Sequence, residues 1–173
     1  MRLALSFVLL FLPFAVQAGD DVETSGDILR AAIPLAAYAM TFHRDDPEGR
    51  VDFYQSFAAN VVTTLALKEL VSKDRPNGSD DDAFPSGHAS TAFQGAAFLH
   101  RRYGLEKAWL AYGLAAYTGW TRVDADEHDA GDVLAGAAVG ILSSVLFVDR
   151  FENVSVSVRL DDQIGLQFSG RFE

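Results

Sequence analysis

Five segments rich in Ala, Gly, Leu and Val follow one another between residues 28 and 148, each long enough for an α-helix. Short connections that contain Gly, Pro, Asp or Asn separate them, and these residues stop helices and form turns. Short connections favour antiparallel packing of successive helices. The helices are expected at Ile28–Phe42, Asp52–Ser72, Ala89–Tyr103, Glu106–Thr121 and Asp129–Val148. We therefore predict an all-α fold, an antiparallel bundle of about five core helices.

The two ends of the chain differ from this helical region. Arg2 precedes an apolar run over 3–16, and small residues follow up to Ala18, which is typical of a secretory signal peptide. An uncleaved N-terminal membrane anchor is the alternative. Residues 154–168 alternate apolar and polar side chains around a central turn, which predicts a short C-terminal β-hairpin. The expected organisation is 1–18 signal peptide or anchor, 19–150 helical domain and 151–173 hairpin tail.

The composition limits the classes of partner and chemistry. The formal net charge is −10, so a nucleic acid partner is not expected, because no basic surface could neutralise many phosphates. There is no cysteine, which excludes a disulfide, a thiolate nucleophile and a zinc–thiolate site. A phosphate-binding site in so acidic a chain must therefore be local, made by a few well-placed cations.

Hydropathy leaves peripheral and integral membrane association open. Most helical segments have about 15 to 18 residues, fewer than the ~20 that a membrane span needs. Asn60 and Gln94 also interrupt the second and third segments, which favours a soluble or peripheral bundle. Gly136 and Gly140 form a small-xxx-small face suited to close helix packing. A periplasmic or other extracytoplasmic location after signal cleavage is expected, with the inner membrane, active site facing the periplasm, as the alternative.

Three polar clusters stand out from the helical sequence, and the first contains Lys68 and Arg75. Seven residues separate them, so on one helix, ended by Pro76, they would share a face. Two solvated basic residues are the alternative interpretation.

The second cluster is Pro85-Ser86-Gly87-His88, at the start of the third helix. Ser86 is a good N-cap residue, and Gly87 lets a ligand approach the backbone closely. The free N–H groups of a helix N-terminus suit an anion, and His88 could protonate a group that leaves it. An ordinary capped helix with a surface histidine is the alternative.

The third cluster contains Arg122, His128 and Asp132. His128 and Asp132 are four residues apart and would share a helix face, where the carboxylate could orient the imidazole. Arg122 could bind an oxygen pair through its guanidinium. A surface His–Asp pair in an acidic loop is the alternative.

Together the clusters resemble the three-part signature of the type 2 phosphatidic acid phosphatase (PAP2) superfamily. That superfamily includes lipid phosphatases, nonspecific acid phosphatases and vanadium haloperoxidases. The matching parts occur in order, as Lys68-x6-Arg75-Pro76, Pro85-Ser86-Gly87-His88 and Thr121-Arg122-x5-His128-x3-Asp132. Thr121 replaces the usual serine, and only residues 77–84 separate the first two parts, which leaves little room for a lid or specificity loop.

The resemblance implies a PAP2-like phosphatase domain over 19–150 that needs no cofactor and no metal. His128 would attack phosphorus and form a phosphohistidine, with Asp132 holding the imidazole. His88 would protonate the leaving oxygen and later activate water. The phosphoryl oxygens would be bound by the remaining signature residues, Lys68, Arg75, Ser86, Gly87 and Arg122.

The expected function is a phosphatase for phosphomonoesters or diphosphates. The substrate class stays open between soluble esters and lipid phosphates such as phosphatidic acid, phosphatidylglycerol phosphate or undecaprenyl diphosphate. A vanadate-dependent haloperoxidase and a non-catalytic envelope interaction protein are the alternatives. His43 and His100 match no part of the signature, and the sequence does not decide the oligomeric state.

Overall fold

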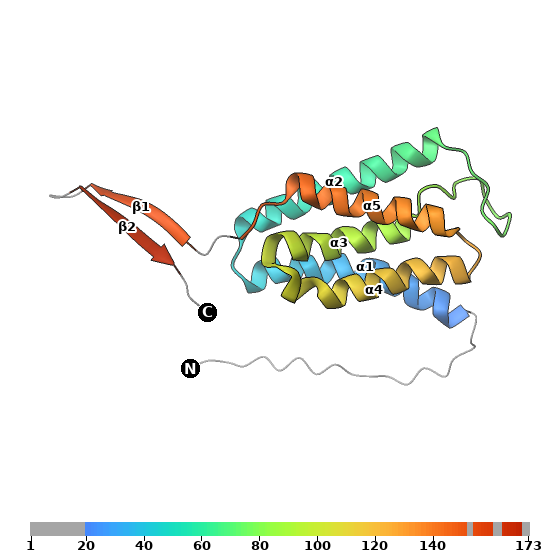
Figure 1. Cartoon of the computed structure of the whole chain (residues 1–173), viewed down its shortest axis with the longest axis horizontal. Helices are drawn as coiled ribbons and strands as arrows, with labels where there is room; N and C mark the ends of the chain where they lie inside the picture. The colour runs from blue at the N-terminus through green and yellow to red at the C-terminus, as the bar shows by residue number, and fades with distance from the viewer. Residues whose placement is uncertain (1–19, 152–153, 161–163, 171–173) are drawn as a thin grey trace.

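The computed structural model describes residues 20–151, 154–160 and 164–170, and its core is a bundle of helices (Figure 1). The five helices are α1 (Asp20–His43), α2 (Pro47–Leu70), α3 (Gly87–Tyr103), α4 (Leu105–Asp124) and α5 (Ala130–Phe147). The central helix is α3, which packs against each of the other four. The predicted all-α bundle is confirmed, whereas the predicted signal peptide over 1–18 lies outside the described residues.

Two strands follow the bundle, β1 (Val154–Leu160) and β2 (Ile164–Gly170). They pair antiparallel, with Val154 opposite Gly170 and Leu160 opposite Ile164. This two-stranded sheet matches the hairpin that the alternating sequence predicts.

The first two helices differ from their predicted bounds, and each has 24 residues. Pro47 starts α2 five residues early, because Asp46 caps the helix by accepting a hydrogen bond from the Gly49 N–H at 2.8 Å. The same helix ends at Leu70, since the following Val71 is already extended. The predicted segment is therefore too short for α1, the predicted bounds of α2 are shifted, and Arg75 lies outside the helix that it was expected to share with Lys68.

Close contact between α3 and α5 depends on two glycines. A Cβ on Gly136 would lie 2.3 Å from the carbonyl oxygen of Ser86, and one on Gly140 would lie 2.2 Å from that of Ser90. Any larger residue would push α5 away from the N-terminal half of α3. The packing role predicted for this small-residue face is confirmed.

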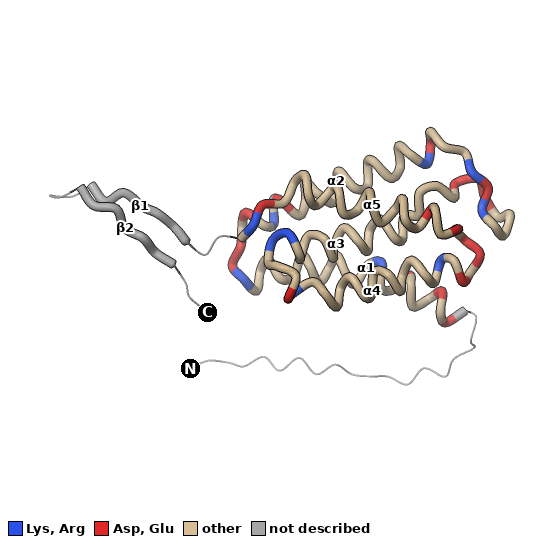
Figure 2. The backbone as a smooth tube through the Cα atoms, viewed as in Figure 1, with Lys and Arg blue, Asp and Glu red and all other residues tan. Residues whose placement is uncertain are grey.

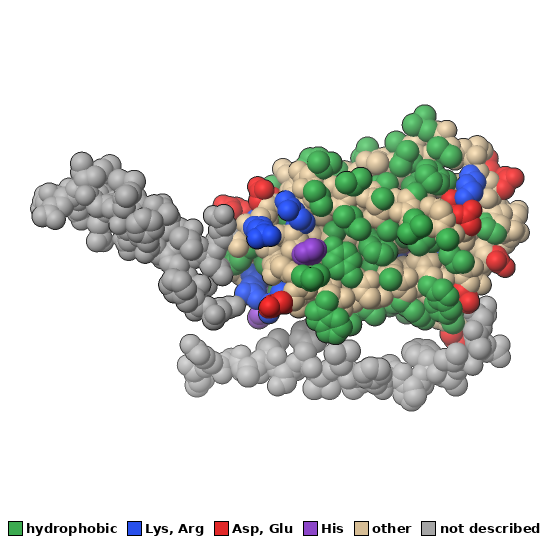
Figure 3. All heavy atoms as spheres, viewed as in Figure 1, with side chains coloured by type: hydrophobic (Ala, Val, Ile, Leu, Met, Phe, Trp, Pro, Cys, Tyr) green, Lys and Arg blue, Asp and Glu red, His purple; other side chains and the backbone are tan. Residues whose placement is uncertain are grey.

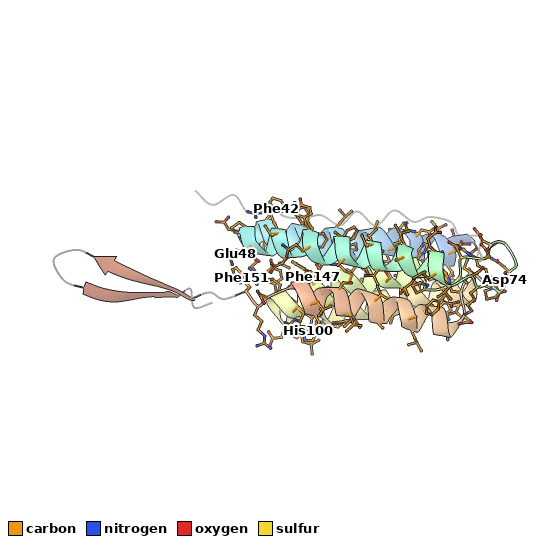
Figure 4. The ribbon with its side chains drawn as sticks, turned by 90° about the horizontal axis from the view of Figure 1, so that it is seen from above. Phe42, Glu48, Asp74, His100, Phe147 and Phe151 are labelled. Atoms are coloured by element: carbon orange, nitrogen blue, oxygen red, sulfur yellow. The ribbon has the colours of Figure 1, made fainter. Side chains whose placement is uncertain are left out.

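A buried ion pair fixes the end of the bundle where α2 begins and α3 ends. Arg102 donates two hydrogen bonds to the Asp46 carboxylate, at 2.6 and 2.8 Å, and both side chains are buried. The Tyr103 hydroxyl donates a further bond to Asp46 at 2.8 Å. In Figure 4, Glu48 and Phe42 mark this end and Asp74 marks the opposite end.

Charged residues gather at the two ends of the bundle and are sparse between them (Figure 2). Hydrophobic side chains cover much of the visible face (Figure 3). Outward-facing residues of α1, α2, α4 and α5 are 65% to 74% exposed, namely Leu35, Val62, Trp109, Leu134 and Leu146. Among the described residues only α5 is both long and apolar enough to cross a membrane, a test that a buried core helix also passes.

The polar residues that interrupt the apolar segments face the inside of the bundle. Asn60 accepts a hydrogen bond from Ser90 at 2.9 Å, and Gln94 donates one to Ser56 at 3.0 Å. All four side chains are fully buried. Each of these side chains therefore bonds within the protein, and the Asn60 amide nitrogen and the Gln94 amide oxygen are buried without a partner among the described residues. Their inward orientation leaves the outer surface apolar.

Candidate active site

All three signature clusters meet at the end of the bundle opposite the Arg102 ion pair. They surround a cavity of about 310 Å³ whose walls come from α1, α2, α3, α4 and the connections 71–86 and 125–129. The signature residues on its wall are Lys68, Arg75, Gly87, His88, Arg122 and His128. Ser86 and Asp132 lie behind this wall, and both are completely buried. Segments far apart in sequence thus contribute to one site.

Arg75 reaches the cavity from the α2–α3 connection, so its predicted place on a helix face with Lys68 is wrong. The connection folds back on itself, because the Lys73 N–H donates to Asp81 and the Arg75 N–H to Asp80, both at 2.9 Å. The Arg75 guanidinium contacts one oxygen of Asp82 at 2.7 and 2.9 Å. Lys68 lies 3.2 Å from the other oxygen, so the two cations converge on one carboxylate.

The second cluster begins α3 as the sequence predicts. Ser86 is the N-cap residue, and its side chain accepts a hydrogen bond from the Ala89 N–H at 3.4 Å. A Cβ on Gly87 would meet nothing nearer than Lys68 and Thr64, both at 4.0 Å, so the backbone here borders open space. The α3 N-terminus therefore turns its partial positive charge toward the cavity.

His128 precedes α5, so it does not share a helix face with Asp132. Its Nδ1 atom is 3.9 Å from the nearer Asp132 oxygen, which is too long for a hydrogen bond. Asp132 instead accepts hydrogen bonds from Lys73 Nζ at 2.6 Å and from the Asp129 N–H at 3.1 Å. The His128 Nδ1 atom is buried and without a hydrogen-bond partner among the described residues. The predicted pair is thus adjacent but not bonded.

Sequence reasoning missed the contribution of α1 to this site. Asp27 lies 2.7 Å from Nε2 of His88 and 3.2 Å from Arg122, which also donates to the Glu23 carbonyl at 2.6 Å. Arg30 lies 3.3 Å from the same His88 nitrogen. Glu23, Asp27 and Arg30 follow the i, i+4, i+7 spacing of one helix face, which is the signal that could have identified them.

Comparisons with known proteins identify the family. A family model described as the PAP2 superfamily matches residues 73–154. A lipid A 4'-phosphatase of Helicobacter pylori strain J99 is 35% identical over 142 residues, which cover 76% of this chain and 71% of that protein. The chain belongs to the PAP2 superfamily. The family assignment made from the signature is confirmed.

Two other relatives are matched over less than two thirds of their own length. A lipid A 1-phosphatase of Helicobacter pylori strain 26695 is 35% identical over 69% of this chain and 64% of that protein. A lipid A 1-phosphatase of Porphyromonas gingivalis is 45% identical over 71 residues, 39% of this chain but 16% of that protein. The crystal structure of Aquifex aeolicus LpxE shares the fold, with a TM-score of 0.63 and 20% identity over 74% of this chain and 83% of that one.

The electrostatics of the PAP2 site keep both histidines neutral near pH 7. Burial lowers the pKa of His128 to about 4, the positive Lys68 and Arg75 lower it further, and the Ala83 backbone and Asp132 oppose them. Burial also lowers the pKa of His88 to about 4, reinforced by Arg122 and opposed by the hydrogen bond with Asp27. A neutral imidazole at His128 has the lone pair that a nucleophile needs.

Opposite charges hold the Asp82 carboxylate and the Lys73 ammonium in their charged forms. Burial would raise the pKa of Asp82, but the hydrogen bonds from Arg75 and Lys68 outweigh it and lower the pKa below its ordinary value. The bonds to Asp129 and Asp132 raise the pKa of Lys73, which burial only partly opposes. The cations of the cavity are therefore matched by protein anions, which an incoming phosphate must replace.

Proposed function

We propose that the protein is a metal-independent phosphatase that releases phosphate from a lipid-linked phosphomonoester through a phosphohistidine. The observation that carries the proposal is the convergence of two neutral histidines and the three signature cations on one cavity of about 310 Å³. Two imidazoles allow one nucleophile and one proton donor, while the cations match a phosphoryl group. The names of the matched relatives, lipid A 1- and 4'-phosphatases, support the same class of reaction.

The reaction has two steps in this proposal. A ring nitrogen of His128 forms a bond to phosphorus while the bond from phosphorus to the leaving oxygen breaks, and His88 gives that oxygen its proton. In the second step water attacks the phosphohistidine, His88 takes a proton from the water, and the phosphorus–nitrogen bond breaks. Inorganic phosphate leaves and His128 returns to its neutral form.

The positions of Asp82 and Asp27 support the roles of the cations. Asp82 bridges Lys68 and Arg75 with its two oxygens, so the same gap accepts two oxygens of a phosphoryl group. Asp27 bridges His88 and Arg122, so Arg122 lies on the same side of the cavity as the proposed proton donor His88. A dianionic phosphate beside His88 would raise the pKa of the imidazole and so load it with the proton that it donates.

His88 is the proposed general acid and Asp132 the proposed positioning residue. Small movement of the His128 ring would close the 3.9 Å gap to the Asp132 carboxylate, and apo geometries of such pairs are often loose. Gly87 would contribute its backbone N–H at the α3 N-terminus, whereas the Ser86 N–H already donates to the Asp132 carbonyl oxygen at 3.0 Å.

The substrate lipid is proposed to reach the site from a membrane. The 24-residue α1 and α2 and the 20-residue α4 are long enough for the ~30 Å apolar core of a bilayer. Exposed apolar side chains lie between two charged ends, which suits lipid contact around the middle of the bundle with the catalytic end outside it. The signal-like segment over 3–16 leads into α1 at the catalytic end, which favours an extracytoplasmic active site.

Phosphate release tests the proposed reaction. Purified protein in detergent is given lipid A, phosphatidic acid, undecaprenyl diphosphate and p-nitrophenyl phosphate, each with and without EDTA. Lipid A or another lipid phosphomonoester should release phosphate, and EDTA should leave the rate unchanged. His128→Ala should lower the rate at least a thousandfold, whereas the control His100→Ala, at the other end of the bundle, should keep it. Peroxide-dependent halogenation with vanadate and no phosphate release would support the haloperoxidase alternative instead.

Orientation is testable because the chain has no cysteine of its own. Ser79→Cys in the exposed α2–α3 connection should react with an impermeant maleimide on intact cells. Lys107→Cys, exposed at the opposite end, should react only after the membrane is permeabilised. The reverse pattern would contradict an extracytoplasmic active site.

A further inference from the structure

An apolar groove of about 530 Å³ runs between α1 and α2 beside the catalytic cavity. Its walls are made almost entirely of apolar and aromatic side chains, among them Pro34, Leu35, Phe53, Phe57 and Val61. Leu35 is 65% exposed although it lines the groove, so the groove is open along its length to the apolar surroundings of the bundle. The groove is concave, and none of the residues that line it belongs to the PAP2 signature.

The groove and the catalytic cavity adjoin each other. Arg30, Val61 and Thr91 line both of them. Arg30 lies 3.3 Å from the His88 ring nitrogen, so the groove begins beside the residue that protonates the leaving oxygen. Whatever is attached to that oxygen is therefore directed into the groove, while the phosphoryl group stays among the cations.

We propose that this groove binds one acyl chain of the substrate lipid, an inference that rests on the phosphatase function proposed above. The lining offers almost no polar partner to water or to a sugar, and a flexible hydrocarbon chain fits it chemically. Arg30 at the junction can contact the polar part of the lipid on its way to the cavity. The substrate class is thus a phosphate ester with a long hydrocarbon chain on the leaving-group side.

Two tyrosines mark the far end of the groove. The hydroxyl groups of Tyr38 and Tyr54 hydrogen-bond to each other and join α1 to α2 across it. Eight residues separate Arg30 from Tyr38, which is ~12 Å along a helix, the span of roughly ten bonds of an extended chain. The binding contribution of the hydrocarbon should therefore level off at about ten carbons.

A series of n-alkyl phosphates with four, eight, ten and fourteen carbons tests the proposal at one fixed detergent concentration. For the wild type, kcat/KM should rise about two- to fourfold per methylene up to roughly ten carbons and then stay constant. Ala31→Trp fills the groove next to Arg30, whereas Ala32→Trp places the same bulk on the neighbouring exposed position outside it.

Ala31→Trp should lower kcat/KM for decyl phosphate at least tenfold and keep kcat/KM for p-nitrophenyl phosphate within twofold of the wild type. Retained activity with p-nitrophenyl phosphate also shows that the variant folds. Ala32→Trp should behave as the wild type with both substrates. If kcat/KM depended on chain length equally in Ala31→Trp and the wild type, the groove assignment would be overturned, and the proposed phosphatase function would be unaffected. If no ester were hydrolysed, the proposed phosphatase function would be wrong. The affinity of decyl phosphate for Ala31→Trp and Ala32→Trp, measured by calorimetry, would then test the groove assignment independently. Equal affinities for the two variants would overturn it.

Discussion

Asp82 bridges Lys68 and Arg75 at the position where a phosphoryl group would bind, so at the scale of single residues it competes with substrate. The side chain is 38% exposed, and ion pairs of this exposure contribute at most about 1 kcal/mol. Asp82→Asn should therefore lower KM and the inhibition constant of inorganic phosphate about two- to fivefold, with kcat nearly unchanged. Steady-state kinetics measure both constants.

The exposed Asp80 lies in the same connection and provides the matched control. Asp80→Asn removes one negative charge without freeing either cation, and it should leave phosphate inhibition as in the wild type. A weaker inhibition by phosphate in Asp82→Asn would contradict the competition and would make Asp82 a positioning residue for Lys68.

Asp27 controls the protonation of His88, which gives a second prediction for a single residue. The carboxylate raises the pKa of His88, so Asp27→Asn should lower that pKa further. In its proposed role as general acid, His88 donates a proton only when it is protonated. The alkaline limb of the pH profile of kcat/KM should therefore move about one pH unit toward acid. Glu23→Gln, which removes a carboxylate near Arg122 but not at His88, should leave the limb in place. An unmoved limb in Asp27→Asn would exclude this role.

At the scale of the helices, contact between α3 and α5 links the catalytic residues to the core. Gly136→Ala would place a Cβ 2.3 Å from the Ser86 carbonyl oxygen, and such overpacking costs about 1 to 3 kcal/mol. The free energy of unfolding should fall by that amount, and kcat should fall with it because the α3 N-terminus is displaced. Gly113→Ala, with no neighbour within 4 Å, should stabilise by up to about 1 kcal/mol. Denaturant unfolding distinguishes the two.

The helices also show what the sequence could predict and what it could not. The start of α5 was predicted to within one residue, because Asp129 is a strong cap that accepts bonds from the Gly131 and Asp132 N–H groups. The start of α1 was missed by eight residues, since its first two turns are polar and are stabilised by contacts with Arg122 rather than by an apolar face.

The candidate site residues come from the motif, and their geometry depends on folding that a motif does not encode. Arg75 reaches the cavity only because the α2–α3 connection folds back through backbone hydrogen bonds. Asp132 bonds to Lys73, a partner 59 residues away that no local spacing indicates. Asp27 is absent from the prediction because the first helix was expected to begin only at Ile28 and because its partner His88 is 61 residues further along the chain.

At the scale of the whole molecule, burying two neutral histidines makes stability depend on pH. Both His88 and His128 have a pKa of about 4 in the folded protein, below the ~6.5 of an unfolded chain. Between these values the unfolded state binds more protons, so unfolding becomes easier as the pH falls. The expected slope is about 1.4 kcal/mol per pH unit for each histidine.

This slope gives the final prediction. The free energy of unfolding, measured in one detergent, should fall steadily from pH 6.5 to pH 4, and the His88→Gln/His128→Gln double variant should lose most of that fall. The matched control His43→Gln/His100→Gln changes two histidines outside the cavity and should keep the wild-type slope. Below about pH 4 a second loss should follow in all three proteins, because the lowered pKa of Asp46 stabilises the fold only while the carboxylate is charged against Arg102. Equal slopes in the wild type and the His88/His128 variant would mean that these two histidines are already solvated. A solvated cavity would not hold the neutral nucleophile that the proposed phosphohistidine mechanism requires.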